Sequence, residues 1–161
     1  MTSPLKIRRA ISEDSAAISK LLYECFAEFE PLYTPQGFAA TTPAAEQVMT
    51  RLNEGPVWIA VLGDDVVGSV GAVAKGRSLY IRGMGVLPSA RGSGVGAQLL
   101  AQVERWAAEC GSTRLFLSTT PFLHAAIRLY ERYGFRRTCD GDHDLFGTPL
   151  LTMEKLIAPG D

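Results

Sequence analysis

The stretch "PSARGSGVGAQLL", Pro88–Leu100, decides how the rest of the sequence is interpreted. It places three glycines within five residues, from Gly92 to Gly96, and then continues as an apolar-periodic segment. Glycine is costly inside a helix and favourable where backbone turns tightly or approaches a partner closely. A glycine-rich turn between a strand and a helix leaves backbone N–H groups free at the positive end of the helix dipole. We therefore expect a loop that binds an anion, most simply a phosphate, rather than a plain turn.

Three phosphate-loop patterns can be compared with this stretch. A nucleotide P-loop needs a Gly-Lys pair, which the chain lacks. A dinucleotide fingerprint, G-x-G-x-x-G/A, is matched by Gly92, Gly94 and Ala97. That fingerprint also needs an acidic residue after the next strand, and "LFLSTT" (115–120) ends without one. The third pattern, Arg-x-x-Gly-x-Gly, is matched by Arg91, Gly94 and Gly96.

The order of predicted elements indicates a mixed α/β domain. Hydrophobic periodicity and cap signals predict four helices. The first covers residues 13–29 and the second runs from Pro43 to about Asn53; the third starts after the glycine loop and stops at Gly111, and the fourth runs from Thr120 to Gly134. Alternating or short apolar runs predict strands at 5–10, 57–63, 66–76, 78–87, 114–119, 135–141 and 150–156. Residues 30–42 are expected to form an ordered loop, and Gly83 and Gly85 suggest a bulge or a close backbone approach. We expect one domain over residues 1–161, a mixed and mostly antiparallel sheet of about seven strands flanked by about four helices.

Composition excludes several other classes of protein. The 161 residues carry a net charge of −1, without the basic surplus typical of nucleic-acid binders. No apolar stretch is long enough to span a membrane, and the N-terminus lacks a signal core. Cys25, Cys110 and Cys139 are widely spaced and follow no metal-ligand pattern. We expect a cytoplasmic protein with reduced thiols, no bound metal, and neither nucleic acid nor membrane as a partner.

Two motifs together resemble one family. Arg91-x-x-Gly94-x-Gly96 follows "MGVLP" (84–88), and "AAIRLYERYGF" (125–135) follows about forty residues later. Both resemble signatures of the GNAT superfamily of acyl-CoA-dependent N-acetyltransferases, whose element order also agrees with the one expected here. The resemblance covers essentially the whole chain and is weakest over residues 30–56. It implies acetyl-CoA as co-substrate, no metal, and direct transfer of an acetyl group to a primary amine in a ternary complex. Because homodimers are common in this family, the resemblance also suggests a homodimer.

The resemblance assigns the cofactor-binding residues. The loop amides would hold the pyrophosphate of coenzyme A, with Arg91 as a candidate to add positive charge. The strand before the loop would offer backbone to the pantetheine arm, and the Val86 N–H could polarise the thioester carbonyl. A plain core role for the Val86 side chain is compatible with this. The implied residues are Met84, Gly85, Val86, Arg91, Gly92, Ser93, Gly94, Val95 and Gly96.

Tyr130 matches the family tyrosine that can protonate the departing sulfur as a general acid. Periodicity with Leu123, Ala126 and Ile127 would favour a core position instead. The surrounding Leu129-Tyr130 and Gly134-Phe135 favour catalysis. Cys25 and Cys110 fall on predicted apolar helix faces, which makes a covalent cysteine route less attractive.

The sequence departs from the family pattern at two places. Leu123 stands where many members carry a cofactor-contacting asparagine, and we expect the neighbouring His124 to be a surface residue. Tyr80 stands where many members carry a strand glutamate as base. The amine could arrive neutral, or the base could come from Glu28, Glu30, Tyr33 or the stretch "CDGDHD" (139–144). For most residues of that stretch a solvated hairpin turn is the better explanation.

The acceptor remains open at the level of sequence. Candidate substrate residues are Glu28, Tyr33 and Tyr80. Phe29, Leu32, Tyr33 and Phe38 could form an acceptor wall or simply anchor a long loop. The acceptor could be a small-molecule amine or a peptide or protein amine. A CoA-binding sensor or interaction module without catalysis is the alternative function.

Overall fold

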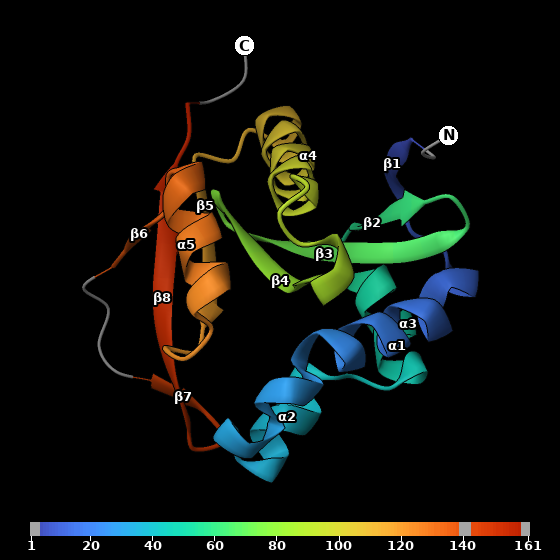
Figure 1. The fold of residues 1–161 in the computed structure, drawn as a ribbon. Coiled ribbons are helices and arrows are strands. Elements are labelled where there is room, and N and C mark those ends of the chain that lie inside the picture. Colours follow the sequence, from blue (N-terminus) through green and yellow to red (C-terminus); the bar gives the residue numbers. More distant parts are fainter. Residues whose placement is uncertain (1–3, 139–142, 159–161) are drawn as a thin grey trace.

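One mixed sheet organises the molecule, which we describe from a computed structural model covering residues 4–138 and 143–158 (Figure 1). The strand order is β1-β2-β3-β4-β5-β8-β6, and β7 pairs with β8 beside this path. The β4–β5 pair is parallel and the other pairs are antiparallel. The strands are β1 Leu5–Arg9, β2 Val57–Leu62, β3 Asp65–Lys75, β4 Ser78–Val86, β5 Arg114–Thr119, β6 Arg136–Arg137, β7 His143–Leu145 and β8 Thr148–Leu156.

Helices cover the two faces of the sheet. The α-helices are α1 Ser15–Phe26, α2 Pro35–Thr41, α3 Ala45–Glu54, α4 Val95–Cys110 and α5 His124–Tyr133. Short 3-10 segments are η1 Ser12–Asp14, η2 Ala27–Leu32 and η3 Pro88–Ala90. In Figure 1, α4 and α5 lie apart from the group formed by α1, α2 and α3, with β4 between them. This arrangement confirms the predicted mixed, mostly antiparallel α/β fold.

The two faces have separate hydrophobic cores. On the α4 face, Leu99, Leu100 and Val103 are fully buried in a cluster that includes Leu79 and Ile81 of β4. On the α1 face, the cluster consists of Ala10, Ile18, Leu22, Val48, Val57 and Ile59. Because side chains of a strand alternate between faces, Tyr80 and Arg82 belong to the α1 face of β4.

Strand β4 is irregular near its end and separates from β5. Its pairing with β3 shifts register between Ser69 and Gly71, opposite Gly83, which adopts a left-handed backbone with φ of 61°. A Cβ on Gly85 would lie 3.0 Å from the sulfur of Cys25. Both features predicted for these glycines, a bulge and a close approach, are therefore confirmed. Pairing with β5 is confined to Ser78–Tyr80 against Arg114–Phe116, so the two strands diverge beyond that point.

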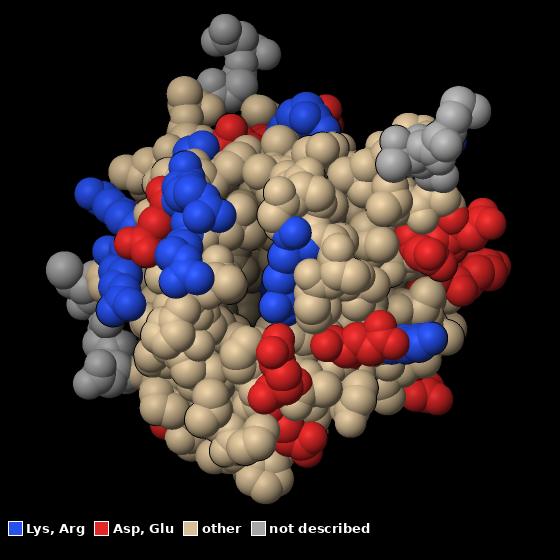
Figure 2. Space-filling view, in the orientation of Figure 1, with Lys and Arg blue, Asp and Glu red and all other residues tan. Residues whose placement is uncertain are grey.

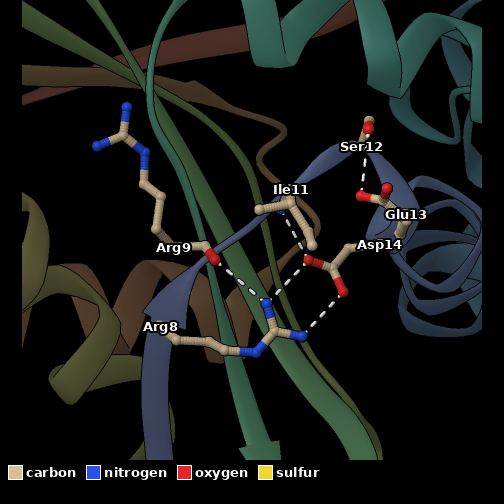
Figure 3. Close-up of polar contacts among 6 residues, drawn as sticks. All are labelled: Arg8, Arg9, Ile11, Ser12, Glu13 and Asp14. Carbon is tan, nitrogen blue, oxygen red and sulfur yellow. Dashed lines mark hydrogen bonds and ion pairs between the residues drawn. The ribbon is translucent and has the colours of Figure 1, made fainter.

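A local polar network fixes the turn from β1 into α1 (Figure 3). The Arg8 guanidinium donates two hydrogen bonds of 2.9 Å to the Asp14 carboxylate, which also accepts from the Ile11 N–H at 2.8 Å. The hydrogen bonds from Arg8 are the main reason that the pKa of Asp14 is lowered. Asp14 thereby serves both as partner of the strand and as the acidic residue expected near a helix start.

Residues 30–42 differ from the expected loop. They contain the end of η2 and the whole of α2, whose N-cap Thr34 accepts from the Gly37 N–H at 3.0 Å. Thr34-Pro35 is the same N-cap and proline signal that predicted a helix at Thr42-Pro43. The second of these helices begins later than expected, at Ala45, because Gln47 caps the Ala44 N–H.

Other boundaries differ less. The first predicted helix is divided into η1, α1 and η2, and the helix expected from Thr120 begins at His124 after a turn. Among the described residues there are eight strands and five α-helices, against about seven and four expected, since β7 and α2 were missed. Of the predicted strand at 135–141, Arg136–Arg137 is a strand, and Cys139–Gly141 lie outside the described residues.

Thr148, the first residue of β8, is hydrogen-bonded to Thr34, the N-cap of α2, which lies 114 positions earlier in the sequence. Its buried hydroxyl accepts from the Thr34 N–H at 2.9 Å and lies 3.1 Å from the Thr34 hydroxyl. We expect Thr148→Val to lower the free energy of unfolding by about 1–3 kcal/mol, because it leaves that N–H without its acceptor. Denaturant titration measures this change. Thr50→Val, at an exposed position of α3, is the control, and equal losses in both variants would contradict the account.

Candidate active site

The glycine loop presents a row of free amides at the start of α4. Gly94 is the N-cap of this helix and has φ of 85°, and Gly92 has φ of 83°, both in the left-handed region. Within the described part of the chain, no backbone or side-chain oxygen accepts a hydrogen bond from the N–H groups of residues 92–97. The unpaired amides and the helix dipole both favour an anion at this place.

A cavity of about 470 Å³ begins at this loop and extends between α5 and the end of α1. Eight of the nine residues assigned to cofactor binding line it, and so does Tyr130. The lining residues are Cys25, Phe26, Phe29, Met84, Gly85, Val86, Ala90, Arg91, Gly92, Gly94, Val95, Gly96, Ala97, Leu123, Ala125, Ala126, Leu129, Tyr130, Arg132 and Tyr133. The cavity therefore joins the free amides to the end of β4, where that strand has left β5.

Charge is distributed unevenly around this cavity. Figure 2 shows a hollow near the middle of the face, with basic side chains gathered over α5 and acidic side chains below. Arg128 and Arg132 are exposed on α5, and Arg132 lines the cavity. A basic rim beside the free amides suits a ligand that carries several negative charges.

Tyr130 is enclosed and yet has an unused hydroxyl. Only 6% of the residue is exposed, and its ring packs against Phe135. Among the described residues, none forms a hydrogen bond with its hydroxyl. Burial raises the pKa of Tyr130, and the neighbouring Tyr33 adds to the shift, so the hydroxyl stays protonated at neutral pH. Tyr130 therefore belongs to the core cluster of the α4 face and also lines the cavity, with a hydroxyl that has no protein partner among the described residues.

Arg91 is turned toward α1 instead of standing free beside the amides. Its guanidinium donates to the Val86 carbonyl at 3.3 Å, to the Cys25 carbonyl at 3.4 Å and to Glu28 at 3.3 Å. These contacts tie the loop to both β4 and the end of α1. Arg91 therefore serves at least in part to position the loop, a role that the sequence did not suggest.

Glu28, considered above as a substrate residue, is the ion-pair partner of Arg91 and does not line the cavity. Its side chain is 54% exposed, and exposed ion pairs contribute little. We expect Glu28→Gln to change kcat/KM for acetyl-CoA by less than about fivefold, because such a pair is worth about 0–1 kcal/mol. Steady-state kinetics test this, and a loss of about 100-fold or more would instead make Glu28 a base.

A second group of aromatic and hydroxyl side chains lies beside Tyr130. The Tyr33 ring meets Phe122 edge to face at 4.9 Å between centroids, and Phe29 lies 6.2 Å from Phe122. Burial raises the pKa of Tyr33, and the nearby hydroxyls of Thr120 and Thr41 act in the opposite direction. Thr120 is 3% exposed, and its Oγ1 forms no hydrogen bond of acceptable geometry with any described residue, Tyr33 included. Buried hydroxyls without partners are uncommon, so this group is suited to meeting a polar ligand.

Two other sequence candidates do not line the cavity. Tyr80 packs its ring against Phe116, and Ser93 donates its hydroxyl to the Ala90 carbonyl. His124 is exposed at the first position of α5, as expected for a surface histidine. Asp140 and Asp142 lie outside the described residues.

Several lining residues were not assigned to the site from sequence. Ala125, Ala126, Leu129, Arg132 and Tyr133 share one side of α5, and their spacing of three and four residues around Leu129 could have indicated this face. Cys25 also lines the cavity, but it is 1% exposed, and burial raises the pKa of its thiol to about 12. An unreactive packing role for Cys25 follows.

None of the helices in the described ranges is long and apolar enough to cross a membrane. The free amides of the glycine loop and the cavity between the end of β4, α5 and the end of α1 define an anion-binding site joined to an apolar pocket. The model of the acetyltransferase (GNAT) family matches residues 17–135, and the chain belongs to this family. It is accordingly an N-acetyltransferase by class.

Relatives agree with this assignment. The chain is similar to an uncharacterized N-acetyltransferase, YjgM, of Escherichia coli K12, with 28% identity over 135 residues and 80% of each chain covered. It is 34% identical over 103 residues to the N-acetylaspartate synthetase of Danio rerio, covering 62% of this chain but only 36% of that protein. The PaiA N-acetyltransferase of Thermoplasma acidophilum, solved with coenzyme A, has the same fold, with a TM-score of 0.80, 16% identity, and 95% and 99% of the two chains covered.

Proposed function

We propose that this protein transfers an acetyl group from acetyl-CoA to a primary amine by direct attack within a ternary complex. The observation that carries the proposal is a single cavity lined both by the glycine loop, whose amides are free, and by Tyr130, whose hydroxyl has no partner among the described residues. The first feature suits a diphosphate and the second suits a proton transfer. Acetyl-CoA needs both, because the pantetheine arm separates its diphosphate from its thioester.

The residues present fit the co-substrate. The amides of residues 92–97 would hold the diphosphate, and Arg132 on the rim adds positive charge. Beyond Tyr80, the β5-facing edge of β4 is released from pairing with β5, so Met84–Val86 can offer backbone groups to the pantetheine amides. When bound, acetyl-CoA supplies the activated acetyl thioester.

The chain's own residues would then orient the reaction and move protons. The Val86 N–H is the proposed donor to the oxygen that becomes negatively charged during attack. The raised pKa of Tyr130 keeps its hydroxyl protonated before the reaction. Tyr130 would donate this proton to the sulfur as the C–S bond breaks, while the neutral amine loses a proton as the amide forms, and that proton, passed through water, would restore the Tyr130 hydroxyl. The Tyr33 hydroxyl, which is close enough to Tyr130 to raise its pKa, and the unpaired Thr120 hydroxyl would hold the attacking nitrogen.

The structure supports a primary amine as the acceptor but does not single out one amine. The aromatic wall of Phe29, Tyr33 and Phe122 suits an amine on either a small molecule or a peptide. One relative's name, N-acetylaspartate synthetase, describes an acetylated amino acid, which supports the small-molecule alternative.

An amine-dependent thiol-release assay tests the proposed function. Purified protein is incubated with acetyl-CoA and a panel of amino acids, polyamines, peptides and antibiotics, and free thiol is titrated. We expect release that depends on the added amine, with the acetylated amine found by mass spectrometry. Tight binding of CoA with no turnover across the panel would favour a CoA-binding sensor and contradict the proposal.

A further inference from the structure

Two arginines lie beside one another on the α1 face of the sheet, outside the cavity described above. Arg82 belongs to β4, and Arg51 belongs to α3. The Arg51 Nη1 lies 3.5 Å from where a Cβ on Gly83 would stand, and both arginines line a second, small cavity next to Ser69 and the β4 bulge.

The pair carries more positive charge than its surroundings neutralise. Arg82 forms an ion pair with Glu54, whose side chain is 48% exposed, and Arg51 donates to the Ala40 carbonyl at 3.3 Å. Burial lowers the pKa of Arg51, and the charge of Arg82 lowers it further. Each guanidinium has five N–H donors, and each uses one of them on an oxygen of the described residues.

The unused donors favour a planar anion. A guanidinium fork matches a carboxylate with two parallel hydrogen bonds, a geometry that a single point charge does not provide. The cavity has about 20 Å³, which is room for one water-sized group. One carboxylate oxygen fits such a space, while the rest of the ligand would lie outside it.

Contacts connect this pair with the acceptor end of the active site. Arg51 donates to the Ala40 carbonyl of α2, and the ring of Phe38 on the same helix meets the Tyr33 ring edge to face, with 5.9 Å between centroids. Tyr33 in turn contacts Phe122, the neighbour in sequence of a residue that lines the cavity. The arginine pair is therefore connected through α2 to the aromatic wall that is proposed to receive the amine.

We propose that Arg51 and Arg82 bind a carboxylate of the acceptor, so that the acceptor is an amino acid or a short peptide. This inference rests on the proposed function and narrows its substrate class. Arg82 precedes Met84–Val86 by two to four residues, or about 7–13 Å along the strand. An acceptor whose amine and carboxylate are several bonds apart suits this distance, as in a dicarboxylic amino acid or a dipeptide.

The test compares acceptors that differ only in the carboxylate. Glutamate, aspartate and a set of dipeptides are each paired with the corresponding carboxamide, and kcat/KM is measured at saturating acetyl-CoA. We expect the wild type to prefer the carboxylates by at least about tenfold, since a hydrogen bond to a charged group is typically worth that much. Arg51→Gln and Arg82→Gln should abolish this preference and leave the KM for acetyl-CoA unchanged.

Two further variants test whether the arginines bind the acceptor carboxylate or only stabilise the local structure. Arg77→Gln, at an exposed turn, makes the same change in net charge and should keep the preference. Glu54→Gln removes the ion pair with Arg82 but keeps both arginines, so it should also keep the preference. The inference would be overturned if Glu54→Gln and Arg82→Gln lost the carboxylate preference equally, or if the wild type showed no such preference. Neither result would contradict the proposed acetylation of amines. Binding of CoA with no amine acetylated would overturn the proposed function, and this inference with it.

Discussion

Tyr130→Phe is expected to lower kcat by at least about 100-fold, because it removes the proton donor for the departing thiolate. The affinity for CoA should not change, since the ring that lines the cavity is kept. Stopped-flow or steady-state assays with an accepted amine, together with calorimetric titration of CoA, measure the two quantities separately.

The free energy of unfolding provides the control for this variant. The Tyr130 hydroxyl has no partner among the described residues, so its removal should leave the protein as stable as the wild type. A stable variant with normal turnover would show that Tyr130 is a core residue only. A large loss of stability would mean that the hydroxyl has a structural partner and would contradict our description of it.

Gly94→Ala is expected to weaken CoA binding by about 10–100-fold, the equivalent of one lost hydrogen bond to a charged group. Gly94 has φ of 85°, and an alanine in this region costs about 1–2 kcal/mol. Because the backbone would relax to avoid this cost, the neighbouring amide N–H groups would change direction. These N–H groups form the proposed diphosphate site. Fluorescence or calorimetric titration with CoA measures the change.

The other end of the same helix offers a matched control. Gly111 is the C-cap of α4 with φ of 73°, and no atom lies within 4 Å of a Cβ placed there, as is also true of Gly94. Gly111→Ala should therefore lose a similar amount of stability and keep its affinity for CoA. If both variants bind CoA equally well, or lose affinity equally, the loop amides do not hold the ligand.

Much of the fold could be predicted because its special positions leave marks in the sequence. Left-handed or crowded backbone requires glycine, so Gly83, Gly85, Gly92 and Gly94 identified the bulge and the loop in advance. The α2 helix was missed although Thr34-Pro35 signals its start, because two prolines and a glycine over residues 31–37 favoured a loop. Its stability depends on Thr148, which no local pattern reveals.

The candidate site could also be predicted only in part, namely where its residues lie in continuous motifs. The loop amides and Tyr130 lie in continuous motifs, and the structure brings both to one cavity. The contacts of Arg91 with Cys25 and Glu28 span 66 and 63 positions and are set by how α1 packs on β4. The Arg51–Arg82 pair is likewise a product of tertiary packing, because the spacing of these two residues follows no motif.

The central claim is that the amides of residues 92–97 hold the diphosphate of acetyl-CoA within the cavity that reaches Tyr130. Titration of isotopically labelled protein with CoA, followed by backbone amide resonances, tests it most directly. We predict that the largest shifts fall on residues 92–97, that Met84–Val86 shift as well, and that NAD produces neither. Shifts confined to other regions, or equal shifts with NAD, would contradict the claim.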